Sequence, residues 1–285
     1  MRFAHPAEAE IARLLDFYGV AWQYEPTTFA LVTGENGKSI QSFTPDFYLP
    51  EHDLYIEMTT MRQSLVTRKN RKFRLLRELY PELNVRLIYR KDVELILDRI
   101  NGSFECSPPQ RSHQLIIRDE HIQRRATEMA ASLCDGRSPA VNVLALGEGA
   151  VRTQQLIANA LLAAGQRIAT GIISLDRFAP GSPPCSVRLV SDGRLDRAEE
   201  VVVVADIVST GLTAQTALRW LRGQGAERVR LVSLLDRRSS RLVDVPLECA
   251  GFPVSSQWLV GGGLGGSPEF SELPDIHFLN PAPAA

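Results

Sequence analysis

The chain of 285 residues has only four cysteines, and none of them belongs to a CxxC pair. That spacing argues against a structural zinc site or a disulfide framework, and it favours a reducing compartment. Uninterrupted apolar runs are also short of the roughly 18 residues that a membrane helix needs, and the amino terminus lacks the apolar core of a signal peptide. We therefore expect a cytoplasmic protein with no membrane partner.

A strong net charge is missing as well. Lys and Arg number 32 against 33 Asp and Glu, a formal net charge of −1, so the whole molecule has no general attraction to nucleic acid. A hydrophobic content of 44% and a charged content of 23% are typical of globular proteins. Any binding of polyanions must come from a local patch.

The length favours two domains, and composition indicates where they meet. Residues 101–113 contain two prolines, one glycine and three serines without apolar periodicity, which is typical of a linker. We predict domains at 1–105 and 114–285, joined by a linker at 106–113. The predicted helices are 6–18, 67–80, 91–99, 119–133, 151–164 and 212–221, with strands near 22–29, 41–47, 54–58, 85–89, 141–145, 168–174, 186–190 and from 201. This alternation predicts an α/β protein whose second domain has a mainly parallel sheet.

The segment VVVVADIVSTGLT, from Val201 to Thr213, is the most informative pattern of the chain. Its apolar run predicts a central strand covered on both faces. The turn at Gly211 then opens an amphipathic segment, so backbone N–H groups of the loop and the helix start converge and favour an anion. The alternative is an ordinary turn between a strand and a helix, since glycine is common there.

Two carboxylates, Asp46 and Glu57, lie in the segment SFTPDFYLPEHDLYIEMTT near the ends of predicted strands. The ten residues between them suffice for a turn and a returning strand, so a hairpin would bring both to one end of a sheet. Paired carboxylates suit Mg²⁺ or Mn²⁺, which can activate water against a phosphodiester. An ordinary surface hairpin is the alternative.

The order of proline-aspartate, hairpin and acid resembles the PD-(D/E)XK nuclease family, which has the restriction-endonuclease-like fold. Pro45, Asp46 and Glu57 match that motif, whereas Thr59 stands where the family has lysine. The resemblance implies Glu8, with Glu10 in reserve, as a third metal-binding acid. It also implies that Lys69 or Lys72 replaces the missing lysine beside the catalytic Asp46 and Glu57.

A basic run follows this motif. From Arg62 to Arg77 the sequence has seven basic residues and no acid. This pattern predicts a helix with a positive face toward phosphates. The predicted nucleic-acid contacts are Arg62, Arg68, Arg71 and Arg74. Taken alone, the run is better explained by a solvated helix face, whereas next to the acidic pair it favours nucleic acid.

The strand and loop at 201–213 resemble the PRPP motif of type I phosphoribosyltransferases, where PRPP is phosphoribosyl pyrophosphate. From about residue 113 to 281 the chain resembles hypoxanthine-guanine phosphoribosyltransferases. The resemblance implies that PRPP or a purine nucleotide contacts Asp206, Ser209, Thr210, Gly211, Leu212, Thr213, Gly147, Glu148, Gly149 and Arg177. It implies that the purine lies against Trp258 and Leu259.

Several positions depart from that family. Ala205 and Ser209 replace acids, and Glu148 replaces a lysine. The base-reading lysine falls at or near Pro246, and a metal-binding aspartate falls at Gly265. Serine does not take up a proton at neutral pH, so we predict that binding is retained and transfer impaired.

Together these patterns predict a metal-dependent nuclease fused to a degenerate purine phosphoribosyltransferase-like domain that senses PRPP or a purine nucleotide. Two alternatives stay open. One is a purine phosphoribosyltransferase that makes a nucleotide from PRPP and carries a nucleic-acid-docking domain. The other is a nucleotide-responsive nucleic-acid-binding protein without catalysis. The resemblance also allows a homodimer.

Overall fold

The computed structural model describes residues 3–34, 36, 38–59, 63–89, 92, 96, 113–134, 140–179, 181–190, 200–255, 258–264, 270 and 272–279. Most of the helix predicted at 91–99 and of the linker lies outside these residues, as do Arg62 and Gly265. By its contacts the chain forms two compact units. Unit 1 comprises residues 1–104 and 177–185, and unit 2 comprises 105–176 and 186–285.

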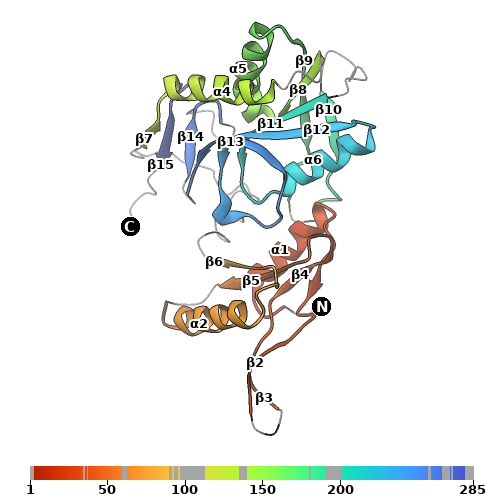
Figure 1. Cartoon of the computed structure of the whole chain (residues 1–285), viewed down its shortest axis with the longest axis vertical. Helices are drawn as coiled ribbons and strands as arrows, with labels where there is room; N and C mark the ends of the chain where they lie inside the picture. The colour runs from red at the N-terminus through yellow and green to blue at the C-terminus, as the bar shows by residue number, and fades with distance from the viewer. Residues whose placement is uncertain are drawn as a thin grey trace. The chain divides into compact units, whose positions relative to one another are not determined.

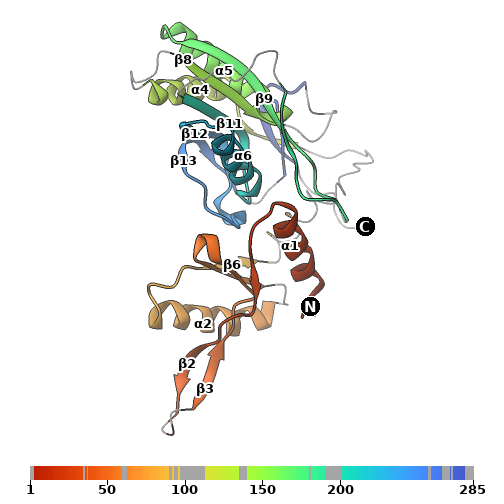
Figure 2. The same cartoon turned by 90° about the vertical axis from the view of Figure 1, so that its right-hand side faces the viewer.

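Unit 1 is built on a sheet with the strand order β1-β4-β5-β6 (Figure 1). Its strands are β1 (Gln23–Tyr24), β4 (Phe47–Leu49), β5 (Leu54–Thr59) and β6 (Val85–Tyr89). Helix α1 (Pro6–Phe17) precedes the sheet, and α2 (Gln63–Leu79) connects β5 to the parallel strand β6. A second hairpin, β2 (Phe29–Thr33) with β3 (Ser39–Phe43), projects from the unit in Figure 2.

The strands predicted at 22–29 and 41–47 are each two strands, divided between two sheets. Proline explains both interruptions. Pro26 and Pro45 lie between the pieces and cannot donate a backbone hydrogen bond to a strand ladder. Glu25, directly before Pro26, also has a positive φ of 45°.

Unit 2 contains a six-stranded sheet with the order β10-β9-β8-β11-β12-β13. The strands are β8 (Ala140–Leu146), β9 (Arg167–Leu175), β10 (Val187–Val190), β11 (Glu200–Val208), β12 (Arg228–Asp236) and β13 (Leu247–Pro253). All neighbours are parallel except β9 and β10. The mainly parallel sheet that the sequence predicts is therefore present, and β11 lies near its centre.

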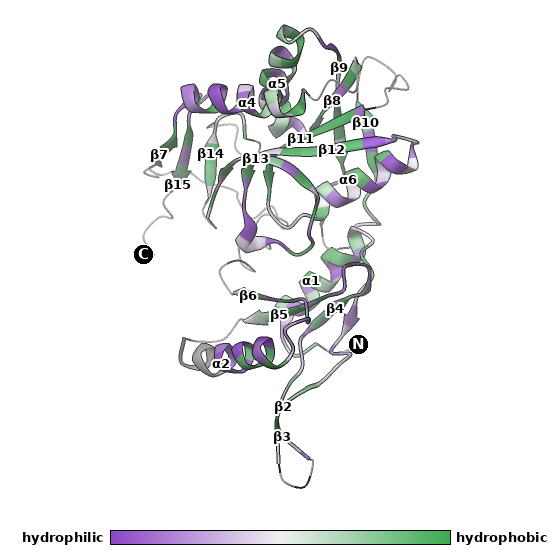
Figure 3. Cartoon of the chain, viewed as in Figure 1, coloured by the Kyte–Doolittle hydropathy of each residue, from purple (hydrophilic) through white to green (hydrophobic). Residues whose placement is uncertain are grey.

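Strand β11 shows why the apolar run is needed. Val202 and Val204 pack with α4 (Asp119–Leu133) and α5 (Val151–Ala163) on one face of the sheet. Val201 and Val203 pack on the other face with α6 (Leu212–Gly223). Alternating side chains of a strand point to opposite faces, so both sets must be apolar when helices cover both. Green predominates in the strands of this sheet in Figure 3, with purple stretches at polar residues.

A smaller sheet completes unit 2, with the order β14-β15-β7. Its strands are β14 (Leu259–Gly261), β15 (Ile276–Leu279) and β7 (His113–Ile117), all antiparallel. Three short 3-10 helices, η1 (Pro50–His52), η2 (Glu148–Ala150) and η3 (Arg238–Ser240), lie in connections. Among the helices of the described residues, none is long and apolar enough to cross a membrane.

Candidate functional site

The predicted phosphate loop follows β11 and begins α6 at the carboxyl-terminal edge of the parallel sheet. Gly211 adopts a left-handed conformation with φ of 86°. A Cβ placed there would lie 2.3 Å from the carbonyl oxygen of Val243. The N–H groups of Leu242 and Val243 donate to the carbonyl of Thr210 at 2.9 and 3.0 Å. The loop is therefore fixed by neighbouring backbone, and glycine is required at its apex.

The side chains of this loop divide by exposure. Asp206, Ser209, Thr210 and Thr213 are half-buried, so their polar groups reach the surface at the loop. Leu212 is fully buried and offers only its backbone, with its N–H donating to the Thr210 hydroxyl at 3.3 Å. Loop N–H groups and hydroxyls at the start of a helix form a suitable cradle for a phosphate.

A second loop reaches the same edge of the sheet, because β8 runs parallel to β11 beside it. Gly147 ends β8 with φ of 80°, and no atom lies within 4 Å of a Cβ built there. Glu148 is exposed, and Gly149 is half-buried. The open space at Gly147 would let a ligand approach the backbone closely.

The residues predicted to hold the purine lie on the way to the small sheet. Trp258 is half-buried, and Leu259 packs into the core of unit 2 with Leu234, Leu235 and Ile276. Leu259 therefore offers a ligand little of its side chain. Arg177, predicted to contact PRPP, is exposed and belongs to unit 1 rather than to unit 2.

Comparison with known proteins identifies the family of this site. Residues 116–259, half of the chain, match the Phosphoribosyl transferase domain. The chain belongs to this family. Hypoxanthine-guanine phosphoribosyltransferase of Bacillus subtilis is 32% identical over 99 residues, which are 34% of this chain and 54% of that protein. The protein of the same name from Lactococcus lactis is 24% identical over 173 residues, 59% of this chain and 91% of its own length.

The solved structures agree on the fold. Hypoxanthine phosphoribosyltransferase of Trypanosoma cruzi, as a K68R mutant in a ternary complex with substrates, matches 59% of this chain and 95% of its own. The TM-score is 0.52 and the identity 24%. Unit 2 therefore has the phosphoribosyltransferase fold.

These comparisons correct the main functional prediction. The nuclease interpretation rested on unit 1, whereas the matched family covers 116–259 and the relatives are hypoxanthine-guanine phosphoribosyltransferases. They favour the alternative of a purine phosphoribosyltransferase over a nuclease. A carboxylate pair such as Asp46 and Glu57 can form in a hairpin without serving nuclease chemistry.

Unit 2 also has a positively charged side chain, Arg237, near the predicted phosphate loop, and the sequence did not single it out. Arg237 follows β12 and is fully buried. Its guanidinium donates to the Ser255 carbonyl at 2.9 Å and lies 3.5 Å from the Ser209 hydroxyl. Pro246, at or near which the base-reading lysine of hypoxanthine-guanine phosphoribosyltransferases would fall, is exposed. The signal for Arg237 is its place directly after a buried strand that runs parallel to β11.

In unit 1 the predicted hairpin does bring Asp46 and Glu57 together. Phe47 pairs with Ile56 in the β4 and β5 ladder, which places the two acids side by side. The Met58 N–H donates to Asp46 Oδ2 at 2.6 Å, and Lys69 forms an ion pair with Glu57. Lys69 therefore lies beside the pair, and its replacement of the missing lysine stays a prediction. Thr59, which stands where the PD-(D/E)XK nuclease family has lysine, is buried.

Burial dominates the electrostatics of this carboxylate pair. Desolvation raises the pKa of Asp46 to about 6, against the opposing Met58 N–H and the Lys69 charge. Desolvation and the Asp46 carboxylate raise the pKa of Glu57 to about 8, again opposed by Lys69. Glu57 Oε2 is buried and has no hydrogen-bond partner within the described part of the chain.

The other predicted metal and nuclease residues are less closely joined to the pair. Glu8 is buried, and its Oε2 accepts hydrogen bonds from the Tyr24 hydroxyl at 2.8 Å and the Ala4 N–H at 3.0 Å. Lys72 donates to the Ser42 carbonyl at 3.2 Å. Within the described residues, no three acid, histidine or cysteine side chains are grouped as a metal site. Metal binding here stays a prediction.

Helix α2 carries the predicted nucleic-acid contacts. Arg71 and Arg74 are exposed on it, as the sequence predicts for a positive helix face, and purple residues alternate with green along α2 in Figure 3. For Arg68 the backbone alone is described. The comparisons lend no support to a nucleic-acid partner, so these contacts also stay a prediction.

Proposed function

We propose that unit 2 transfers the phosphoribosyl group of PRPP to a purine base. The observation that carries this proposal is the fixed phosphate loop at Ser209 to Thr213, in a chain that belongs to the phosphoribosyl transferase family. The names of its relatives, hypoxanthine-guanine phosphoribosyltransferases, support an oxopurine as the acceptor. Such a transfer joins a purine nitrogen to C1 of the ribose and releases pyrophosphate.

The residues of the loop suggest a division of labour. The loop N–H groups and the hydroxyls of Thr210 and Thr213 would hold the 5′-phosphate, and Asp206 would bind the ribose hydroxyls. Backbone at Gly147 would face the pyrophosphate. Mg²⁺ or Mn²⁺ would bind with PRPP and neutralise part of its charge there, which also makes the exposed Glu148 tolerable.

Ser209 limits the rate that we expect from this site. It offers no general base, and general-base help typically contributes about 10² to 10⁴ in rate. Arg237 is fully buried 3.5 Å from the Ser209 hydroxyl, so it would instead place a positive charge behind the loop. We therefore expect slow turnover with retained binding of PRPP.

The proposal is tested by incubating the protein with PRPP, Mg²⁺ and hypoxanthine or guanine, and by measuring pyrophosphate release. Thr213→Val removes a hydroxyl from the phosphate loop, and we expect it to weaken PRPP binding at least tenfold, because a charge-assisted hydrogen bond contributes about 1.5 to 3 kcal/mol. The measurement is the KM for PRPP.

Thr216→Val is the matched control, since it makes the same change one turn further along α6. Its hydroxyl is buried without a hydrogen-bond partner, so its loss should leave both fold and KM unchanged. Absence of pyrophosphate release with every purine would overturn the transferase proposal. Equal effects of the two variants would show that the loop hydroxyl does not hold phosphate.

For unit 1 we propose the restriction-endonuclease-like fold. Support comes from the order of a helix, the β4 and β5 hairpin, the crossover helix α2 and the parallel strand β6. The adjacency of Asp46, Glu57 and Lys69 agrees with it. This proposal concerns the fold and assigns no catalytic activity to unit 1.

A further inference from the structure

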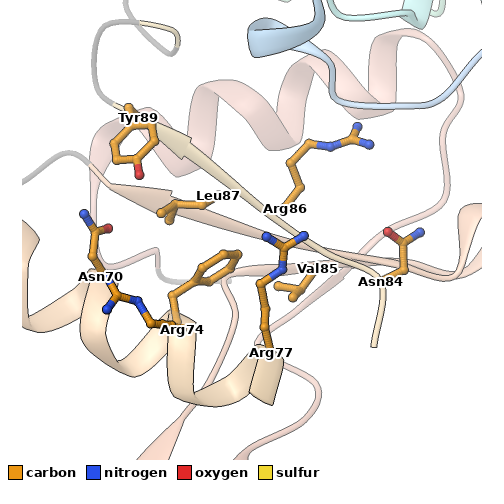
Figure 4. A pocket seen from close by; sticks show the side chains of 9 residues that line it. Asn70, Arg74, Arg77, Asn84, Val85, Arg86, Leu87 and Tyr89 are labelled. Atoms are coloured by element: carbon orange, nitrogen blue, oxygen red, sulfur yellow. The ribbon is translucent and has the colours of Figure 1, made fainter. Parts of the chain in front are cut away.

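A pocket of about 550 Å³ lies in unit 1 between α2 and β6 (Figure 4). Helix α2 contributes Asn70, Arg74 and Arg77 to its lining, and Arg86 and Tyr89 come from β6. This pocket is separate from the carboxylate pair, and no part of the function proposed for unit 2 uses it.

The spacing on α2 explains why its polar groups converge. Positions 70, 74 and 77 are four and three residues apart, so they lie on one helix face. Phe73 lies within this stripe, and its ring has the Arg77 guanidinium 5.7 Å from its centroid. The opposite side of the helix is anchored in the core of unit 1, because Leu76 is fully buried there with Leu31 and Val85. The stripe is thus presented on a fixed helix.

The charge of the pocket is one-sided. Three of its nine lining residues are arginines and none is acidic. Arg74 and Arg77 form no ion pair with any residue that the structure describes. Neighbouring like charges repel each other, and an anion between them relieves that repulsion. Guanidinium groups match phosphate oxygens in geometry and bind them through paired hydrogen bonds.

A further group in the pocket lacks a partner. The amide oxygen of Asn70 is buried and has no hydrogen-bond partner among the residues that the structure describes. A buried acceptor left unsatisfied is costly, so it favours a ligand that also carries an N–H or O–H donor. The aromatic rings of Phe73 and Tyr89 in the same lining offer apolar surface to a ring system.

We propose that this pocket binds a small phosphorylated molecule of nucleotide size. Its phosphates lie against Arg74 and Arg77, and a hydroxyl or amino group donates to Asn70. The volume is within the range of roughly 300 to 1,000 Å³ that small-molecule pockets occupy. The polar groups are gathered in one pocket between a helix and a strand, which suits a compact ligand better than an extended nucleic-acid strand. Unit 1 would then respond to a nucleotide while unit 2 makes one.

The proposal is tested on the full chain with three probes: inorganic pyrophosphate, ADP and a single-stranded DNA 12-mer. Hydrogen exchange of peptides from 69–80 and 84–89 reports on this pocket and not on unit 2, which has its own phosphate loop. We expect ADP to protect both peptides, and pyrophosphate to protect them less strongly.

Arg74→Gln and Arg77→Gln should each raise the ADP concentration needed for half-maximal protection by at least tenfold, because each removes a charged donor. Arg71→Gln is the matched control, since Arg71 is exposed on the same helix and does not line the pocket. It should change that concentration by less than about twofold, as a single surface charge contributes little.

Three results would overturn the proposal. The first is no protection of either peptide by ADP or pyrophosphate. The second is an equal loss in all three variants, which would show general attraction by the basic helix. The third is protection by the DNA 12-mer alone, which would assign the surface to a nucleic acid. The transferase activity proposed for unit 2 is measured separately, by pyrophosphate release. A negative result in the hydrogen-exchange experiment on unit 1 therefore leaves the transferase proposal intact.

Discussion

Gly211 is constrained both by its own backbone and by its surroundings. Its φ of 86° is unfavourable for any side chain, and a Cβ would contact the Val243 carbonyl at 2.3 Å. Gly211→Ala should therefore destabilise unit 2 by about 2 kcal/mol or more and displace the loop that we propose holds phosphate. Urea unfolding and the KM for PRPP measure the two effects.

Gly223 at the end of the same helix is the control for that substitution. Nothing lies within 4 Å of a Cβ built there, and the helix is already formed. Gly223→Ala should leave KM unchanged and stabilise the protein by about 0.5 to 1 kcal/mol, because alanine favours helix. A Gly211→Ala protein of wild-type stability and KM would contradict the steric argument.

Asp46 and Glu57 make the stability of unit 1 depend on pH. Their pKa values rise on folding from near 4 to about 6 and about 8. The folded chain therefore holds more protons than the unfolded chain between about pH 4 and pH 8, so the free energy of unfolding falls as pH rises through that window. Glu57→Gln should remove the part of this fall nearest pH 8.

The measurement is hydrogen exchange of β5 peptides at pH 5 and pH 8, corrected for intrinsic exchange rates. Glu51→Gln, at an exposed residue of η1, is the control and should keep the wild-type pH dependence. Added Mg²⁺ should protect β5 at pH 8 in wild type but not in Glu57→Gln if these acids bind a cation as predicted. A wild-type pH dependence in Glu57→Gln would refute the linkage.

Some site residues could be predicted from sequence because their signal is local. Asp46 and Glu57 are joined by one hairpin, and Gly211 follows its strand directly. Arg237 could not be predicted in the same way. In the segment DRRSSR an arginine is typical of solvent exposure, and only the parallel pairing of β12 with β11 brings it beside Ser209.

At the level of elements, helices were predicted more accurately than strands. The helix at 119–133 matches α4, and its boundaries follow from its own apolar periodicity. The small sheet β14-β15-β7 was not predicted. Its strands pair across long separations, as His113 does with Leu279, and each is only three to five residues long. Such strands gain their stability from partners that no local pattern reveals.

Strand β6 also shows that local sequence predicts an element but not its neighbours. Its bounds match the prediction of 85–89, since alternating apolar residues mark it. Its place beside α2, where Arg86 and Arg77 line one pocket, depends on the crossover from β5. The basic run therefore predicted positive charge correctly, whereas the concave surface that gathers it is a tertiary feature.

For the whole molecule, the connection between β9 and β10 changes the division into units. Residues 177–185 belong to unit 1, although both flanking strands belong to unit 2. The Phe178 ring packs edge-on against Phe17 of α1 with centroids 5.3 Å apart, and the Cys185 N–H donates to the Phe17 carbonyl at 2.8 Å. The segment is therefore a structural part of unit 1.

Phe178→Ala should destabilise unit 1 by about 3 kcal/mol, because it removes a buried aromatic side chain. Hydrogen exchange should accelerate in α1 peptides and stay unchanged in α5 peptides of unit 2. Arg177→Ala, an exposed neighbour, is the control and should leave α1 exchange unchanged. Unaltered α1 exchange in Phe178→Ala would mean that the segment contributes nothing to unit 1.

The same segment has a consequence for the order in which the protein is made. A ribosome releases the first 104 residues early, but unit 1 lacks its last nine until residue 185 has been synthesised. By then β8 and β9 of the other unit have also been synthesised, because they precede residue 185 in the chain. Unit 1 can therefore begin to fold first, but it cannot be completed until residues 177–185 in the second half of the chain have been synthesised.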